Sequence, residues 1–89
     1  MRLPRSERLA GQAVVITGAA SGIGRALAQR LSKHGCPVAI ADVDEAGLAG
    51  TAELLGSPTL CKVLDVRSAA DLAGFADEVR AWMPGRARG

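Results

Sequence analysis

A glycine-rich segment is the part of this sequence whose residue types and spacing best fit a chemical task. Gly18, Gly22 and Gly24 lie between a β-branched apolar run and an amphipathic segment. Where a strand leads into a helix, the free N–H groups and the helix dipole favour a bound phosphate. Gly18 permits a tight turn, Gly22 lets a phosphate approach the backbone, and Gly24 allows close packing of helix against strand. With the Ser21 hydroxyl as a further donor, the segment predicts a pyrophosphate-binding loop.

An aspartate follows this loop at the spacing expected for a ribose-binding acid. Asp42 ends the apolar run 38–41 and lies 18 positions after Gly24, close to the roughly 20 that is typical. A carboxylate there accepts hydrogen bonds from both hydroxyls of an adenosine ribose and repels a 2′-phosphate, which favours NAD over NADP. A glycine-rich connector and a turn aspartate without any ligand are the structural alternatives. The pairing of the two features favours the functional interpretation.

Three strand–helix units are expected to position these residues. The expected strands are 13–17, 38–41 and 60–64, and the expected helices run from Ile23 to Gly35, from Asp44 to Gly56 and from Ser68 to Met83. Alternation with short loops predicts an α/β fold with a parallel sheet of order 3-2-1 and right-handed crossovers. Asp44 and Ser68 are expected to cap the second and third helices.

The helical segments differ in how well their residues suit a helix. In the first helix, apolar residues at helical spacing predict one buried stripe, made of Ile23, Ala26, Leu27 and Leu31. Arg25 is expected to face solvent or a carboxylate on its own helix. In the second helix, Gly47 and Gly50 each cost about 1 kcal/mol relative to alanine.

Residues 17–24 (TGAASGIG) resemble the TGxxxGIG signature of the short-chain dehydrogenase/reductases. Residues 40–42 (IAD) are similar to that family's NAD-preferring second strand, and residues 64–66 (LDV) to its third-strand ending. Ser21 stands where NADP-preferring members often carry a basic residue. The resemblance covers residues 7–83 and implies a partial Rossmann fold of three parallel strands and three helices. It implies these cofactor-binding residues: Gly18, Ser21, Gly22, Ile23, Gly24, Asp42, Asp65 and Val66.

The resemblance also implies chemistry that this sequence does not carry. Hydride transfer between NAD and an alcohol or carbonyl would need the family's catalytic Ser and its Tyr-x-x-x-Lys pair, and this sequence contains no tyrosine. We therefore expect the NAD-binding N-terminal portion of such an enzyme, truncated before its catalytic residues and inactive alone, with no catalytic residue and no metal site. The alternatives are a non-catalytic nucleotide-binding or regulatory module, a non-functional fragment and, less favoured, a Rossmann-like methyltransferase.

Length and composition set further expectations. The 89 residues suffice for one small domain, expected at 11–83 between an N-terminal extension 1–10 and a tail 84–89. The net charge of +2 does not indicate nucleic acid as a partner, no apolar run is long enough to span a membrane, and the charged N-terminus suggests the cytoplasm. Cys36 and Cys61 are expected to be small buried hydrophobes.

The first strand is expected to lie at an open edge of the sheet. Because only the third helix is left to cover one sheet face, that face is expected to be partly exposed and apolar, with poor stability of the chain in isolation. Association through the edge of the first strand is the partner interaction that this arrangement predicts.

Overall fold

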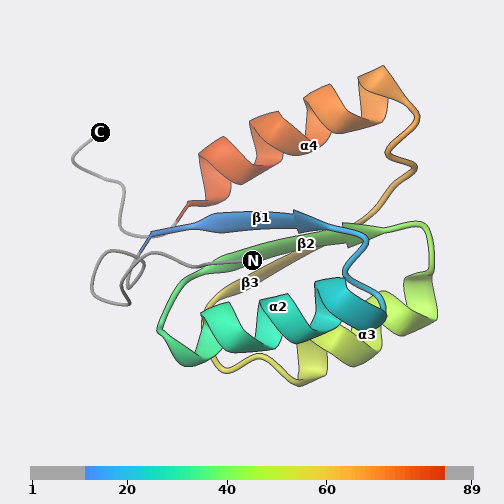
Figure 1. The fold of residues 1–89 in the computed structure, drawn as a ribbon. Coiled ribbons are helices and arrows are strands. Elements are labelled where there is room, and N and C mark those ends of the chain that lie inside the picture. The colour runs from blue at the N-terminus through green and yellow to red at the C-terminus, as the bar shows by residue number, and fades with distance from the viewer. Residues whose placement is uncertain (1–11, 84–89) are drawn as a thin grey trace.

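The computed structural model describes residues 12–83 and places three strands and three helices in them, alternating along the chain (Figure 1). The elements are β1 (Val14–Thr17), α2 (Gly22–Lys33), β2 (Val38–Asp42), α3 (Glu45–Glu53), β3 (Thr59–Val63) and α4 (Ala69–Trp82). The expected extension 1–10 and tail 84–89 lie outside the described residues. None of the helices within 12–83 has the length and apolar content needed to cross a bilayer.

The three strands form one parallel sheet with β2 in the centre. The sheet order is β1-β2-β3, and Ile40 of β2 pairs with Ile16 of β1 and with Cys61 of β3. Helices α2 and α3 cover one face and α4 covers the other (Figure 1). The α/β class, the parallel pairing and the order 3-2-1 expected from the sequence are thereby confirmed.

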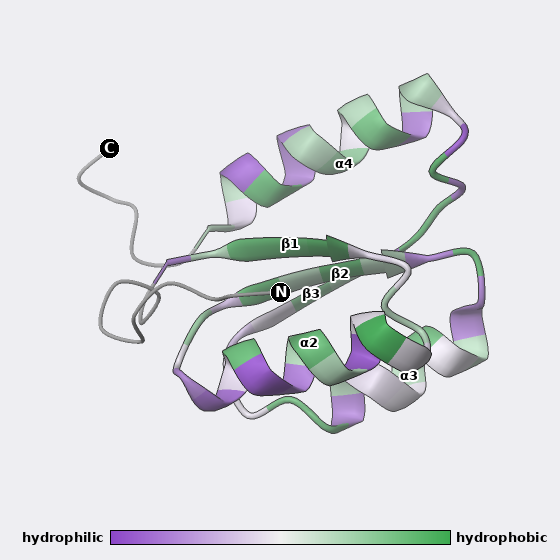
Figure 2. Ribbon diagram, in the orientation of Figure 1, coloured by the Kyte–Doolittle hydropathy of each residue, from purple (hydrophilic) through white to green (hydrophobic). Residues whose placement is uncertain are grey.

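The apolar core consists of two clusters, one on each side of β2. On the α2 and α3 side, Val38 and Ile40 pack with Leu48. On the α4 side, Ala39 and Ala41 pack with the residues that α4 and the end of β3 supply, namely Leu64, Phe75 and Val79. Because both of its faces are covered, β2 is apolar at four successive positions, as buried parallel strands are. Figure 2 shows this apolar character along β1 and β2.

Helix α2 buries two members of the expected apolar stripe, Leu31 fully and Leu27 in part, and leaves the other two exposed. Ala28 and Leu31 are buried, whereas Ile23 is 86% exposed and Ala26 is also exposed. The expected stripe is therefore wrong at these two positions. The physical reason is Gly24, which packs directly against the backbone of Gly18 and so sets the rotation of the helix.

The two cysteines also differ from each other. Cys36 is buried and Cys61 is exposed, so the expectation of a buried thiol is wrong for Cys61. The physical reason is that β3 lies at the edge of the sheet, where a side chain has neighbours on fewer sides than in the central strand β2.

The α4 face of the sheet is incompletely covered, as expected. The cluster beneath α4 is built on β2 and the end of β3, and Val15 of β1 is 49% exposed. An apolar side chain on an edge strand is thus half open to solvent.

Helix capping follows the sequence closely. The Asp44 side chain accepts a hydrogen bond from Gly47 N, and the Ser68 hydroxyl accepts one from Asp71 N. Both predicted N-caps are confirmed, and each satisfies a backbone donor that the helix itself leaves free.

Candidate cofactor site

The glycine-rich segment forms a turn at the carboxyl edge of the sheet. Gly18 has a φ of 69° and Gly22 a φ of 59°, both in the left-handed region that favours glycine. Ala19 N donates to Ala41 O at 3.2 Å, which holds the start of the turn against β2. A Cβ on Gly24 would lie 2.8 Å from the carbonyl carbon of Gly18, so α2 approaches β1 as closely as the sequence predicts.

The N-terminus of α2 differs from those of the other two helices. Its N-cap, Ser21, makes no side-chain capping bond, and its first turn contains no acidic residue. The N-cap side chains of α3 and α4, in contrast, each accept a hydrogen bond from a backbone N–H in the first turn of the helix that they cap. The space beside Gly22 is open, with no atom within 4 Å of where a Cβ would be. These features fit a phosphate group, because an uncapped helix start presents N–H donors and a partial positive charge.

Asp42 is bonded directly to the glycine-rich turn. Its Oδ2 accepts from Ala20 N at 3.0 Å, and its Oδ1 accepts from Asp44 N at 3.0 Å. The bond from Asp44, followed by that from Ala20, lowers the pKa of this carboxyl, so it is ionised at neutral pH. A carboxylate has about four acceptor sites. Each Asp42 oxygen therefore keeps acceptor capacity for a ribose hydroxyl.

Asp65 and Val66 follow β3 at the same edge of the sheet. Leu64 N donates to Asp42 O at 3.0 Å, which places the end of β3 beside the end of β2. The Asp65 carboxylate accepts from Arg67 N at 2.9 Å and pairs with Arg67 Nη2 at 2.9 Å, and the Arg67 side chain is the main cause that lowers its pKa. Val66 is half exposed. Asp65 is thus bonded to Arg67 rather than to the turn, and the cofactor-binding role that the family resemblance implies stays a prediction for both residues.

Arg25 has a position that sequence reasoning missed. Its side chain bonds to Thr51 Oγ1 and to the carbonyl oxygens of Ala20 and Gly47, so the expectation of solvent or a carboxylate on its own helix is wrong. The sequence of α3 did contain a signal for this contact. Two unfavourable glycines there, Gly47 and Gly50, indicate that something packs closely against that helix.

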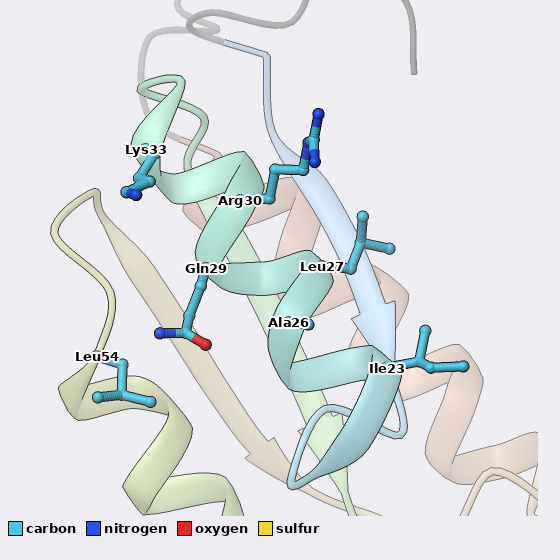
Figure 3. Close-up of a pocket in the computed structure, with 7 residues that line it drawn as sticks. All are labelled: Ile23, Ala26, Leu27, Gln29, Arg30, Lys33 and Leu54. Atoms are coloured by element: carbon cyan, nitrogen blue, oxygen red, sulfur yellow. The ribbon is translucent and has the colours of Figure 1, made fainter. Parts of the chain in front are cut away.

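A shallow groove runs along the outer face of α2, away from Asp42. It has a volume of about 670 Å³ and is lined by Ile23, Ala26, Leu27, Gln29, Arg30, Lys33 and Leu54. Figure 3 shows Ile23 and Leu27 pointing to one side of α2 and Gln29 to the other, toward Leu54. The side chain of Ile23 therefore lies on this outer face. Any contact of Ile23 with a cofactor is expected through its backbone.

The fold and the turn together define a class of protein. A glycine-rich turn between the first strand and first helix of a parallel sheet, bonded to an acid at the end of the second strand, is the dinucleotide-binding arrangement of Rossmann-type α/β proteins. The sequence model of the family described as short chain dehydrogenase matches residues 12–86. This chain belongs to the short-chain dehydrogenase family.

Individual relatives agree with this assignment. An NADP-dependent dehydrogenase of Cochliobolus lunatus is 43% identical over 79 residues, covering 88% of this chain and 27% of the relative. An 11-beta-hydroxysteroid dehydrogenase-like protein of Arabidopsis thaliana is 49% identical over 74 residues, covering 79% and 22%. The crystal structure of a Burkholderia phymatum short chain dehydrogenase/reductase in complex with NAD superposes with a TM-score of 0.82 at 36% identity, covering 84% and 28%. The chain spans about a quarter of the length of these proteins.

Proposed function

We propose that this chain binds the adenosine and pyrophosphate portions of NAD, as part of a dehydrogenase that transfers hydride between NAD and an alcohol or carbonyl group. The bond between Asp42 Oδ2 and Ala20 N is the observation that carries this proposal, because it joins the ribose acid to the phosphate loop. The backbone of Gly18, Ser21, Gly22, Ile23 and Gly24 holds the pyrophosphate. Asp65 and Val66 border the adenine.

The proposed chemistry is divided between the cofactor and the protein. NAD supplies the site that accepts or gives a hydride. The residues of this chain bind and orient the adenosine end, and we propose that the chain has no dehydrogenase activity alone, since the sequence has no tyrosine for proton transfer.

Asp42 supports NAD rather than NADP as the preferred cofactor. The relative from Cochliobolus lunatus is named NADP-dependent and the Burkholderia phymatum structure contains NAD, so the choice for this chain rests on its own residues. An ionised carboxylate at the ribose repels a 2′-phosphate, and Ser21 offers no positive charge to hold one.

Calorimetric titration with fragments of the cofactor tests the proposed function. We expect ADP to bind the chain nearly as tightly as NAD, because both carry the adenosine ribose and the pyrophosphate. Nicotinamide mononucleotide, which lacks that ribose, should bind at least about tenfold more weakly. Asp42→Ala should weaken ADP and NAD binding by about 10- to 100-fold, the range expected when hydrogen bonds to a charged group are lost.

A matched control separates this effect from a general loss of charge. Asp77→Ala removes an exposed carboxylate from α4, on the other side of the sheet, and should leave both affinities within about twofold. Absence of ADP binding by the folded wild-type chain, or equal binding of ADP and nicotinamide mononucleotide, would contradict the proposal.

A second candidate function is association through the open edge of β1. Within residues 12–83, β1 has β2 as its one neighbour in the sheet, and Val15 beside that edge is half exposed. Unpaired strand edges of this kind template pairing with another chain.

Sedimentation equilibrium tests this association. We expect the wild-type chain to show concentration-dependent self-association between about 10 and 100 μM, in the range where exposed edges associate. Val15→Lys should shift the chain toward monomer, because an edge lysine disfavours pairing. A wild-type chain that stays monomeric over this range would rule the second function out.

A further inference from the structure

Arg25 joins its own helix, α2, to the glycine-rich turn and to α3. Its Nη2 donates to Ala20 O at 2.7 Å and to Gly47 O at 2.8 Å, and its Nε donates to Thr51 Oγ1 at 2.7 Å. One acceptor lies in the glycine-rich turn and two lie in α3. The planar guanidinium presents donors in a fixed fork, so these bonds fix the turn relative to α3.

Helix α3 has glycines at the two positions where the turn and the Arg25 side chain approach it. A Cβ on Gly50 would lie 3.1 Å from Arg25 Nη2, tighter than ordinary contact, and a Cβ on Gly47 would lie 2.9 Å from Cβ of Ala20. Both glycines are less favourable in a helix than alanine would be. Their presence is explained by the close approach of the turn and of the Arg25 guanidinium.

The bonds continue from Arg25 to the ribose acid. Ala20 is held on both sides: its carbonyl accepts from Arg25, and its N–H donates to Asp42 Oδ2 at 3.0 Å. Thr51, which is fully buried, closes the arrangement by donating to Ala19 O at 2.7 Å. Without Arg25, the carbonyl of Ala20 loses its charged donor, and the Ala20–Asp42 bond is supported only through the bond from Thr51 to Ala19 O.

We propose that Arg25 is a positioning residue that fixes Ala20, and through Ala20 the carboxylate of Asp42, in the arrangement that receives the adenosine ribose and the pyrophosphate. This inference rests on the proposed cofactor function. Arg25 itself contacts the protein rather than the cofactor. Its effect on affinity comes from preorganisation, since a preformed site loses less conformational freedom when the ligand binds.

The test compares two replacements of Arg25 with a control on the same helix. Arg25→Met removes the donors and keeps much of the apolar stem, and Arg25→Lys keeps the charge without the fork. We expect ADP affinity to fall about tenfold or more in Arg25→Met, comparable to loss of one charged hydrogen bond, and by a smaller factor in Arg25→Lys. Arg30→Met, on the exposed outer face of α2, should stay within about twofold of wild type.

A second readout needs no cofactor. The pKa of the Asp42 carboxyl, measured by carbon-13 NMR titration, is lowered in the wild-type chain by its bonds from Asp44 and Ala20. We expect it to rise toward the ordinary value of about 3.9 in Arg25→Met and to stay unchanged in Arg30→Met. Because Arg25→Met also removes a positive charge near Asp42, the same titration is made on Arg25→Lys, which keeps the charge. A rise of the Asp42 pKa in that variant reports a change in the position of Ala20.

The outcomes separate this inference from the proposed function. If the wild-type chain binds no ADP, the cofactor function fails and the Asp42 pKa still tests the position of Ala20. If wild type binds ADP, and folded Arg25→Met binds it equally with an unchanged Asp42 pKa, the positioning role is wrong. If Arg25→Met does not fold, Arg25→Lys decides the matter by the same two measurements, with wild-type values in both overturning the proposal.

Discussion

Replacing Gly24 by alanine is expected to destabilise the domain more than the same replacement at any other glycine within residues 12–83. The added Cβ would overlap the carbonyl oxygen of Gly18 and would lie 2.8 Å from its carbonyl carbon and 3.0 Å from Cα of Ala19. All three are backbone atoms, which cannot rotate away as the end of a side chain can. Helix α2 would have to move off β1, and the turn between them would lose its geometry.

The expected size of this effect follows from overpacking. Forcing atoms into a packed site costs up to about 3 kcal/mol and occasionally more, and a backbone clash belongs at the upper end. For a domain of this size, that corresponds to a fall in Tm of about 15 °C, measured by circular dichroism. Because small domains are only marginally stable, a chain that is largely unfolded at 25 °C is also consistent with the prediction.

Gly74→Ala is the matched control and should stabilise the domain instead of destabilising it. Gly74 lies in the middle of α4, and nothing is within 4 Å of where its Cβ would be. Alanine is about 0.8–1 kcal/mol more favourable than glycine inside a helix, so Tm should rise by a few degrees. Equal Tm values for Gly24→Ala and Gly74→Ala would show that the close approach of α2 to β1 does not limit stability.

The discrimination between NAD and NADP is expected to depend on Asp42. Under the proposed function, the wild-type chain should bind NAD at least about tenfold more tightly than NADP, because a 2′-phosphate beside a carboxylate places like charges together, at a cost of several kcal/mol when partly desolvated. Asp42→Ser removes the charge and two acceptor sites. NAD affinity should then fall while NADP affinity stays equal or rises, so the ratio of the two dissociation constants approaches one.

Competition titrations with ADP and its 2′-phosphorylated form isolate this effect, because the two ligands differ only in the phosphate. The preference for ADP should also shrink at high salt in the wild-type chain, since screening weakens repulsion between partly exposed charges. An unchanged preference in Asp42→Ser would show that a group other than this carboxylate discriminates against the 2′-phosphate.

Much of the fold and part of the candidate site follow from local sequence patterns. Short β-branched runs ending in glycine or aspartate predict the strands, capping residues such as Asp44 and Ser68 predict the helix starts, and the parallel alternation predicts the sheet order. Because parallel strands share one carboxyl edge, the same patterns also bring the glycine-rich turn and Asp42 together. Their direct bond through Ala20 N is the detail that the structure adds.

The rotation of α2 was decided only by tertiary structure. Apolar residues occupy a wide arc of this helix, so periodicity alone leaves two faces in competition for the sheet. The contact of Gly24 with Gly18 selects the face that carries Ala28 and leaves Ile23 exposed. A contact between backbone segments of this kind has no periodic signature in the sequence.

The partners of the charged side chains were likewise decided by the tertiary structure. Arg25 reaches acceptors 5, 22 and 26 residues away, two of which come close only when α3 packs beside α2. The sequence by itself determined which elements form and at which edge of the sheet the turn and Asp42 meet, since these depend on local patterns and on strand direction. Which side chains fix that turn depends on how the packed helices face one another, and only the folded chain establishes it.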